Sequence, residues 1–221
     1  VYFGTGKYLE KSDAVPDTTT VQSVYGIWDK NLSTLTPITR NDLQEQTITD
    51  EITQFGDQLS VVSSNRINWT QQDGWYLDLK SPVSGAQGEM VVTDPKLRSG
   101  KLIFTTLIPN PNICSSGGTS WTVEINASSG GRLPYSVFDL NGDNTFNSQD
   151  YVKITNPNTG KVTYVPVSGR QSTNGILSQP TILSNGKVEY KYLQGSNGKT
   201  ERIIENPGPG ANGRQSWRQL Q

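Results

Sequence analysis

The chain has 221 residues, of which 32% are hydrophobic, and it contains 22 glycines and 12 prolines. A low apolar content with many turn-forming residues is typical of a loop-rich β-protein. Nineteen basic and 20 acidic residues give a net charge of −1 without any basic block, which argues against nucleic-acid binding. Histidine is absent, which excludes Ser-His-Asp and Cys-His catalysis and histidine-ligated zinc.

No apolar run is as long as a bilayer span, so we expect no membrane-spanning segment. The first six residues already resemble the end of a strand, which suggests that the chain was cut from a longer protein. A single cysteine, Cys114, has no partner for an internal disulfide. We expect it to pair with a missing portion or to be a small buried hydrophobe, and not to act in catalysis.

Short runs rich in Val, Ile, Thr, Tyr and Trp predict strands along the whole chain, with no long helix. The predicted strands are residues 1–9, 21–28, 47–49, 58–64, 74–79, 89–94, 101–108, 117–126, 161–167, 175–183, 187–193 and 200–204. Residues 101–108 are almost all apolar, which predicts burial on both faces. Asn185-Gly186 and Asn197-Gly198 predict hairpins, and Gly26 inside a strand predicts a bulge or a close backbone approach.

A weak repeat favours a β-propeller over a β-sandwich. Residues 74–79 and 119–125 share an aromatic, an aliphatic, an acidic and a second aliphatic position, and Gly-rich turns separate the strands. Short strands with a periodic aromatic residue are typical of propeller blades. At about 40–50 residues per blade, the chain would form about four or five blades of one domain, residues 1–221. That number suits a small propeller or part of a larger one.

Residues 139–150 have the spacing of an EF-hand-type calcium loop. Positions 1, 3, 5, 7, 9 and 12 are Asp139, Asn141, Asp143, Thr145, Asn147 and Asp150. Calcium prefers six to eight oxygen ligands, and alternate residues of a tight loop can supply them, position 7 through its backbone carbonyl. The sequence therefore predicts one Ca²⁺ site with these six residues as ligands. The alternative is a polar turn that binds nothing.

Two positions depart from the usual loop. Asn144 replaces the glycine that position 6 normally needs for a positive φ, and Asp150 replaces a longer glutamate. Asparagine tolerates positive φ better than most residues. Upstream lie Pro134 and β-forming residues, and downstream 151–154 could form a short helical turn that ends before Pro157. Because no helix pair flanks the loop, we expect the metal to clip a loop of a β-protein and not to act as a calcium sensor.

Several motifs occur in the same order as in the PilC/PilY family of type IV pilus tip and biogenesis proteins. The matching stretches are residues 3–9, 22–29, 74–79, 101–109, 114–121, 138–143 and 213–220. The chain thus resembles the C-terminal part of that family over nearly its whole length. The resemblance implies a modified β-propeller, either a whole one or part of a larger seven-bladed one, with a calcium-binding loop inserted at 139–150.

The resemblance also implies a non-enzymatic role at the type IV pilus (fimbrium). Expected functions are pilus extension against retraction, surface adhesion, twitching motility and virulence. Expected partners are minor pilins, the host-cell surface and the upstream part of the same protein, which would complete the fold. The location would be the cell surface, reached through the periplasm and outer membrane.

Two other functions fit parts of the sequence. A quinoprotein-like propeller dehydrogenase would resemble residues 121–127 and would also use calcium, but no quinone-binding constellation is visible. A dockerin-like extracellular module would match the calcium loop, but it needs two loops with helices between them. The tryptophans are candidates for a carbohydrate or partner platform, and we expect Trp75 and Trp121 to be core residues and Trp217 to latch the C-terminal strand.

Overall fold

The computed structural model of the chain describes residues 1–30, 37–112 and 116–209. Cys114 and Trp217, for which the sequence made predictions, lie outside these residues. The described part is all-β, as predicted, and its helices are single 3₁₀ turns: η1 (Lys11–Ala14), η2 (Arg40–Asp42) and η4 (Ser148–Asp150). Within these ranges, no helix is both long and apolar enough to cross a bilayer.

Three sheets and two ribbons contain the strands of the described residues. The first sheet has the order β1 (Tyr2–Gly4), β2 (Ser23–Ile27), β6 (Gly74–Asp78), β3 (Gln44–Gln46). The second has the order β4 (Ile48–Gln54), β5 (Asp57–Val62), β14 (Gly169–Gln171), β11 (Trp121–Asn126), β8 (Lys101–Thr105), β7 (Lys96–Arg98). The third has the order β15 (Thr181–Ser184), β16 (Glu189–Gln194), β17 (Thr200–Glu205). The ribbons are β9 (Ile108–Pro109) with β10 (Gly118–Thr119), and β12 (Val152–Thr155) with β13 (Val162–Val165).

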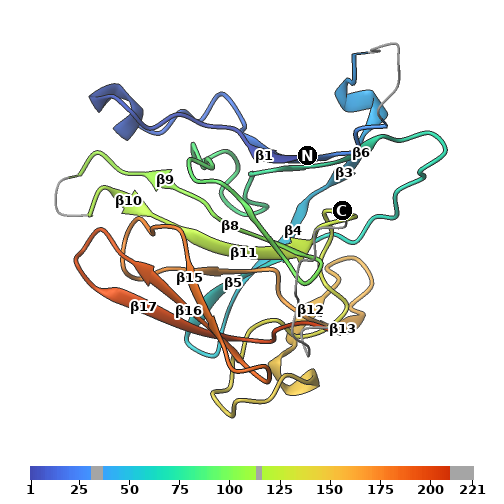
Figure 1. Cartoon of the computed structure of the whole chain (residues 1–221), viewed down its shortest axis with the longest axis vertical. Helices are drawn as coiled ribbons and strands as arrows, with labels where there is room; N and C mark the ends of the chain where they lie inside the picture. Colours follow the sequence, from blue (N-terminus) through green and yellow to red (C-terminus); the bar gives the residue numbers. More distant parts are fainter. Residues whose placement is uncertain (31–36, 113–115, 210–221) are drawn as a thin grey trace, which may run out of the picture.

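The three sheets are stacked, with the six-stranded sheet between the other two (Figure 1). One hydrophobic cluster joins the first sheet to the second and includes Val24, Trp75, Leu77, Phe104, Trp121 and Ile125. A second cluster includes Leu59, Val137, Phe138, Val152, Leu193 and Ile203. Both faces of the central sheet are therefore covered, as expected for antiparallel sheets that pack face to face.

Strands β8 and β11 of the central sheet direct side chains toward both neighbouring sheets. Side chains alternate along a strand, so Phe104 and Ile125 enter the first cluster while Lys101 and Glu124 point to the opposite face. All five residues of β8 are buried. The prediction that residues 101–108 are buried on both faces is therefore confirmed.

Trp75 is clamped between two glycines. A Cβ atom at Gly26 or at Gly130 would lie 2.3 Å from an atom of the Trp75 ring. The indole Nε1 donates to the carbonyl oxygen of Ala127 at 3.0 Å, and the ring is only 1% exposed. The close approach predicted for Gly26 is confirmed, and so is the core position of Trp75.

Other local predictions had mixed outcomes. The two Asn-Gly turns connect β15 to β16 and β16 to β17, as predicted. The predicted strand at 89–94 is wrong, because only Met90 forms a bridge there, to Leu107. The helical turn suggested after the calcium loop is also wrong, because that segment is strand β12. Its β-branched Val152 and Ile154 pack into the second cluster, which favours the extended form.

Candidate metal loop and aromatic pocket

The loop at 139–150 is anchored at both ends to the core. At its start, Phe138 pairs with Glu205 of β17, and the Asp139 backbone N–H donates to Ile204 O at 3.1 Å. At its end, the 3₁₀ turn η4 leads directly into β12, where Val152 is fully buried. The loop therefore joins the edge of the third sheet to the β12–β13 ribbon.

Asp139 organises the first half of the loop. Its Oδ1 accepts hydrogen bonds from the backbone N–H groups of Gly142 and Asp143 at 2.8 and 3.1 Å, and its Oδ2 accepts one from Asn144 at 2.9 Å. Asn144 has a φ of 61°, which is the left-handed turn predicted for position 6. The backbone thus makes the required sharp turn without glycine at that position.

The other two carboxylates have different environments. Asp143 is exposed, and its Oδ1 accepts hydrogen bonds from the Thr145 hydroxyl and backbone N–H, which hold the pKa of Asp143 below its usual value. Asp150 is fully buried and accepts hydrogen bonds from Leu140 N at 2.9 Å and Asn147 N at 3.0 Å. These two hydrogen bonds connect Asp150 to the beginning and the end of the loop, so its carboxylate stabilises the loop independently of any metal ligation.

The donor chemistry fits a hard cation. No salt bridge joins a Lys or Arg to Asp139, Asp143 or Asp150 among the described residues, so three negative charges lie in one loop without a protein counter-ion. Each carboxylate has about four lone-pair sites, and the hydrogen bonds above use only some of them. In the described part of the chain, no group of three or more His, Cys, Asp or Glu residues is placed to hold a metal. A calcium ion would therefore need amide and backbone oxygens as well.

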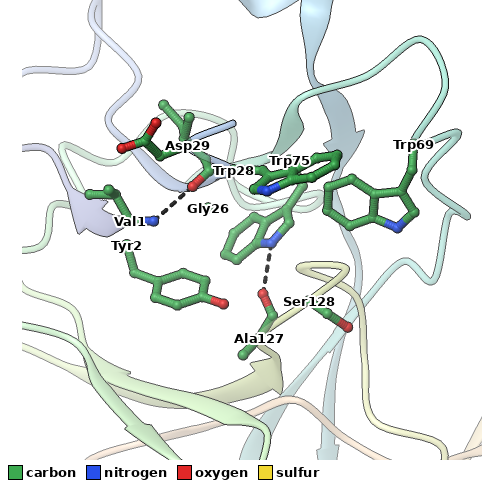
Figure 2. Close-up of a pocket in the computed structure, with 10 residues that line it drawn as sticks. Val1, Tyr2, Gly26, Trp28, Asp29, Trp69, Trp75, Ala127 and Ser128 are labelled. Carbon is green, nitrogen blue, oxygen red and sulfur yellow. Dashed lines mark hydrogen bonds between the residues drawn. The ribbon is translucent and has the colours of Figure 1, made fainter. Parts of the chain in front are cut away.

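A separate aromatic pocket opens beside the first sheet (Figure 2). It has a volume of about 600 Å³ and lies where the end of β2 meets the 127–128 turn. Its lining comprises Val1, Tyr2, Gly26, Ile27, Trp28, Asp29, Trp69, Trp75, Ala127 and Ser128. The sequence singled out the tryptophans as a possible platform but gave no sign that Tyr2 and Asp29 join them.

Two half-exposed indoles form one corner of the pocket. Trp28 and Trp69 are 48% and 43% exposed, and their rings meet edge to face at 85° with centroids 5.7 Å apart. The Lys30 ammonium lies 5.4 Å from the centroid of the Trp28 ring. On the inner side, Tyr2 approaches Trp75 with centroids 6.3 Å apart.

A buried charge cluster between the second and third sheets was not predicted. Its members are Lys101, Glu124, Glu189, Lys191 and Glu205, all with fully buried side chains. Lys101 Nζ is 2.9 Å from Glu124 Oε2, and Lys191 contacts both Glu124 and Glu205. Burial alone would raise the pKa of Glu124, but the two lysines outweigh it and hold that pKa below its usual value. The cluster therefore adds charge–charge contacts between these two sheets to the apolar contacts of the second hydrophobic cluster.

Comparisons with known proteins agree with the stacked-sheet architecture. Residues 1–58 match the family described as the PilY1 beta-propeller domain. The crystal structure of the Pseudomonas aeruginosa PilY1 C-terminal domain superposes with a TM-score of 0.73 and 30% identity, covering 94% of this chain and 42% of that one. The fold is thus an all-β, propeller-type domain, as predicted.

Curated relatives give the family. The type IV pilus biogenesis factor PilY1 of Pseudomonas aeruginosa (strain PAO1) is 33% identical over 237 aligned residues, which cover all of this chain and 19% of the relative. A PilY1 homolog from Xylella fastidiosa is 41% identical over 142 residues, 64% of this chain and 11% of the relative. The chain belongs to the PilY1 family as part of a PilY1-type C-terminal domain. It spans about a fifth of the length of its PilY1 relatives from Pseudomonas aeruginosa.

Proposed function

We propose that this chain acts in type IV pilus biogenesis as a non-enzymatic propeller module of a longer protein. The observation that carries this proposal is the alignment of the whole chain with a PilY1 pilus biogenesis factor, together with the shared fold. In this role the module supports pilus extension against retraction, twitching motility and surface adhesion. Its partners are pilus components such as minor pilins, the host-cell surface and the upstream part of the same protein, and it works at the cell surface.

The proposal includes one calcium ion in the 139–150 loop. The side chains of Asp139, Asn141, Asp143, Asn147 and Asp150 and the backbone carbonyl of Thr145 would supply the oxygens. When bound, calcium neutralises carboxylates that otherwise repel one another. The loop begins beside β17 and ends at β12, so an ordered loop would fix the third sheet relative to the ribbon.

The test uses the full-length protein in cells. Asp143→Ala removes an exposed loop carboxylate that takes no part in the core. Asp17→Ala is the matched control, because Asp17 also accepts from the hydroxyl and N–H of a threonine two residues on, Thr19, but lies far from the loop in sequence. We expect fewer surface pili and smaller twitching zones only with Asp143→Ala, at equal protein level.

Two results would contradict the proposal. Normal piliation after deletion of the region that corresponds to this chain would contradict the proposed role in pilus biogenesis. Normal piliation with Asp143→Ala, alongside loss of pili on deletion, would leave the pilus role intact and remove the contribution of the calcium loop.

A further inference from the structure

A polar groove lies at one end of the central sheet, on the face that also contributes to the first hydrophobic cluster. Its volume is about 360 Å³, at the lower end of the range of about 300–1,000 Å³ that is typical of small-molecule pockets. Side chains from four strands (β4, β5, β14 and β11) and from the loop after β6 line it. The groove is therefore assembled by the fold and not by one segment of the sequence.

The floor of the groove is a row of four side chains on neighbouring strands. Thr53 of β4 pairs with Gln58 of β5, and Gln171 of β14 pairs with Trp121 of β11. The register between β5 and β14 places Gln171 next to Gln58. Paired residues project from the same face of a sheet, and neighbouring strands are about 4.8 Å apart. The four side chains therefore lie side by side along one line.

The wall of the groove is the loop after β6, which is fastened to the floor. The Ser81 hydroxyl donates to Glu51 Oε2 at 2.7 Å, and its oxygen accepts from the backbone N–H groups of Val83 and Ser84 at 3.1 and 2.9 Å. The same loop carries Gln87 to the groove. The wall is thus ordered before any ligand arrives, which lowers the entropic cost of binding.

Three amides in the groove are available to a ligand. The side chains of Gln58, Gln87 and Gln171 make no hydrogen bond with the part of the protein that the structure describes. Each amide can donate two hydrogen bonds and accept two. Glu51 is the one charged residue in the described lining, and one of its oxygens already accepts from Ser81. The groove therefore offers several donors and acceptors but little charge.

This polarity distinguishes between ligand classes. An anion would be expected to find Lys or Arg, which the described lining lacks, and an apolar ligand would leave the amides desolvated without partners. An extended peptide usually binds along the edge of a sheet, whereas this row lies on a sheet face. Sugar hydroxyls both donate and accept, as the amides do. The C–H groups of a sugar ring can pack against Val83, which is 75% exposed, and against the small exposed part of Trp121.

We propose that the polar groove binds a neutral sugar, with the amides of Gln58, Gln87 and Gln171 hydrogen-bonded to its hydroxyl groups. This chemistry is shared by free monosaccharides and by neutral sugar units of glycoconjugates. The proposal depends neither on calcium in the 139–150 loop nor on the pilus role, because none of the groove residues belongs to that loop.

The test is saturation-transfer NMR on the whole chain with D-glucose, D-galactose and D-mannose. Each is paired with its uronic acid, which keeps the ring and adds a carboxylate that Glu51 repels. We expect saturable binding of at least one neutral sugar and at least about tenfold weaker binding of its uronic acid. Gln58→Met and Gln171→Met remove an amide at similar side-chain volume, so each should weaken binding about threefold to tenfold. Gln54→Met is the matched control, because Gln54 follows Thr53 on β4 and projects from the opposite face.

A further arm distinguishes the two sources of the sugar. Binding of the chain to immobilised neutral glycans points to a glycoconjugate, and binding to free monosaccharides alone points to a small solute. The proposal is overturned if none of the three neutral sugars binds saturably or if the uronic acids bind equally well. It is also overturned if trialanine binds in place of the sugars, or if the folded double variant Gln58→Met/Gln171→Met keeps the wild-type affinity.

Discussion

Glu89 makes the stability of the domain depend on pH. The residue is 4% exposed and lines a small cavity with Leu79, Phe104 and Trp121. Burial raises the pKa of its carboxyl from 4.5 to about 7, with a small further rise from Glu51, although a hydrogen bond with Thr106 acts in the opposite direction.

The sign of the effect follows from the two pKa values. Below pH 4.5, Glu89 is protonated in both the folded and the unfolded chain, so its titration does not lower the free energy of unfolding. Between pH 4.5 and 7 the unfolded chain loses this proton while the folded protein keeps it, so stability falls as pH rises. Above pH 7 the loss in free energy of unfolding caused by Glu89 is constant. One pKa unit is worth about 1.4 kcal/mol, so the full deficit is on the order of 3 kcal/mol.

Glu89→Gln removes the titration and keeps the shape. We expect this variant to be more stable than the wild type by up to about 3 kcal/mol at pH 8, and nearly equal to it at pH 4.5. The measurement is urea unfolding at several pH values, with a chelator present so that calcium does not contribute. The exposed Glu10→Gln serves as control. A difference between Glu89→Gln and wild type that does not grow with pH would refute the reasoning.

Two other substitutions test the packing. Lys191→Met leaves Glu205 buried without its cation, so we expect the free energy of unfolding, measured in urea, to fall by about 3–5 kcal/mol. Adding Glu205→Gln should restore part of this loss. An unchanged stability of Lys191→Met would contradict the ion pairing in the charge cluster. Gly130→Ala places a Cβ against Trp75 and should cost about 2–4 kcal/mol, whereas Gly198→Ala, with a similar φ of 84° and open space around it, should cost only about 1 kcal/mol. Equal losses at the two glycines, measured by thermal unfolding, would show that the clamp on Trp75 is unimportant.

The sequence predicted features that depend on local geometry. The hairpins follow from Asn-Gly turns, the burial of β8 follows from an unbroken apolar run, and the positive φ of Asn144 follows from the spacing of the loop. The turns and the positive φ depend on neighbouring residues, and an unbroken apolar run indicates burial without identifying the sheets that cover it, which is why the pattern alone was sufficient.

Features that depend on contacts between sheets were not predictable. In β16, Tyr190 and Tyr192 share one face by strand alternation, but it is the opposite face, with Lys191 and Leu193, that is fully buried. Lysine is rarely buried, and nothing in one strand reveals that Glu124 of a distant strand will pair with it. The aromatic pocket likewise unites residues from five separate stretches of the sequence.

The most direct test of the account is a calorimetric calcium titration of the chain with the variants Asp143→Ala and Asp17→Ala. We expect one calcium ion to bind the wild type and Asp17→Ala, and binding at least about tenfold weaker in Asp143→Ala. Calcium at about 100 times its Kd should also stabilise the wild type by about 2.7 kcal/mol. Absence of binding to the wild type, or an equal loss in both variants, would contradict a calcium clip at residues 139–150.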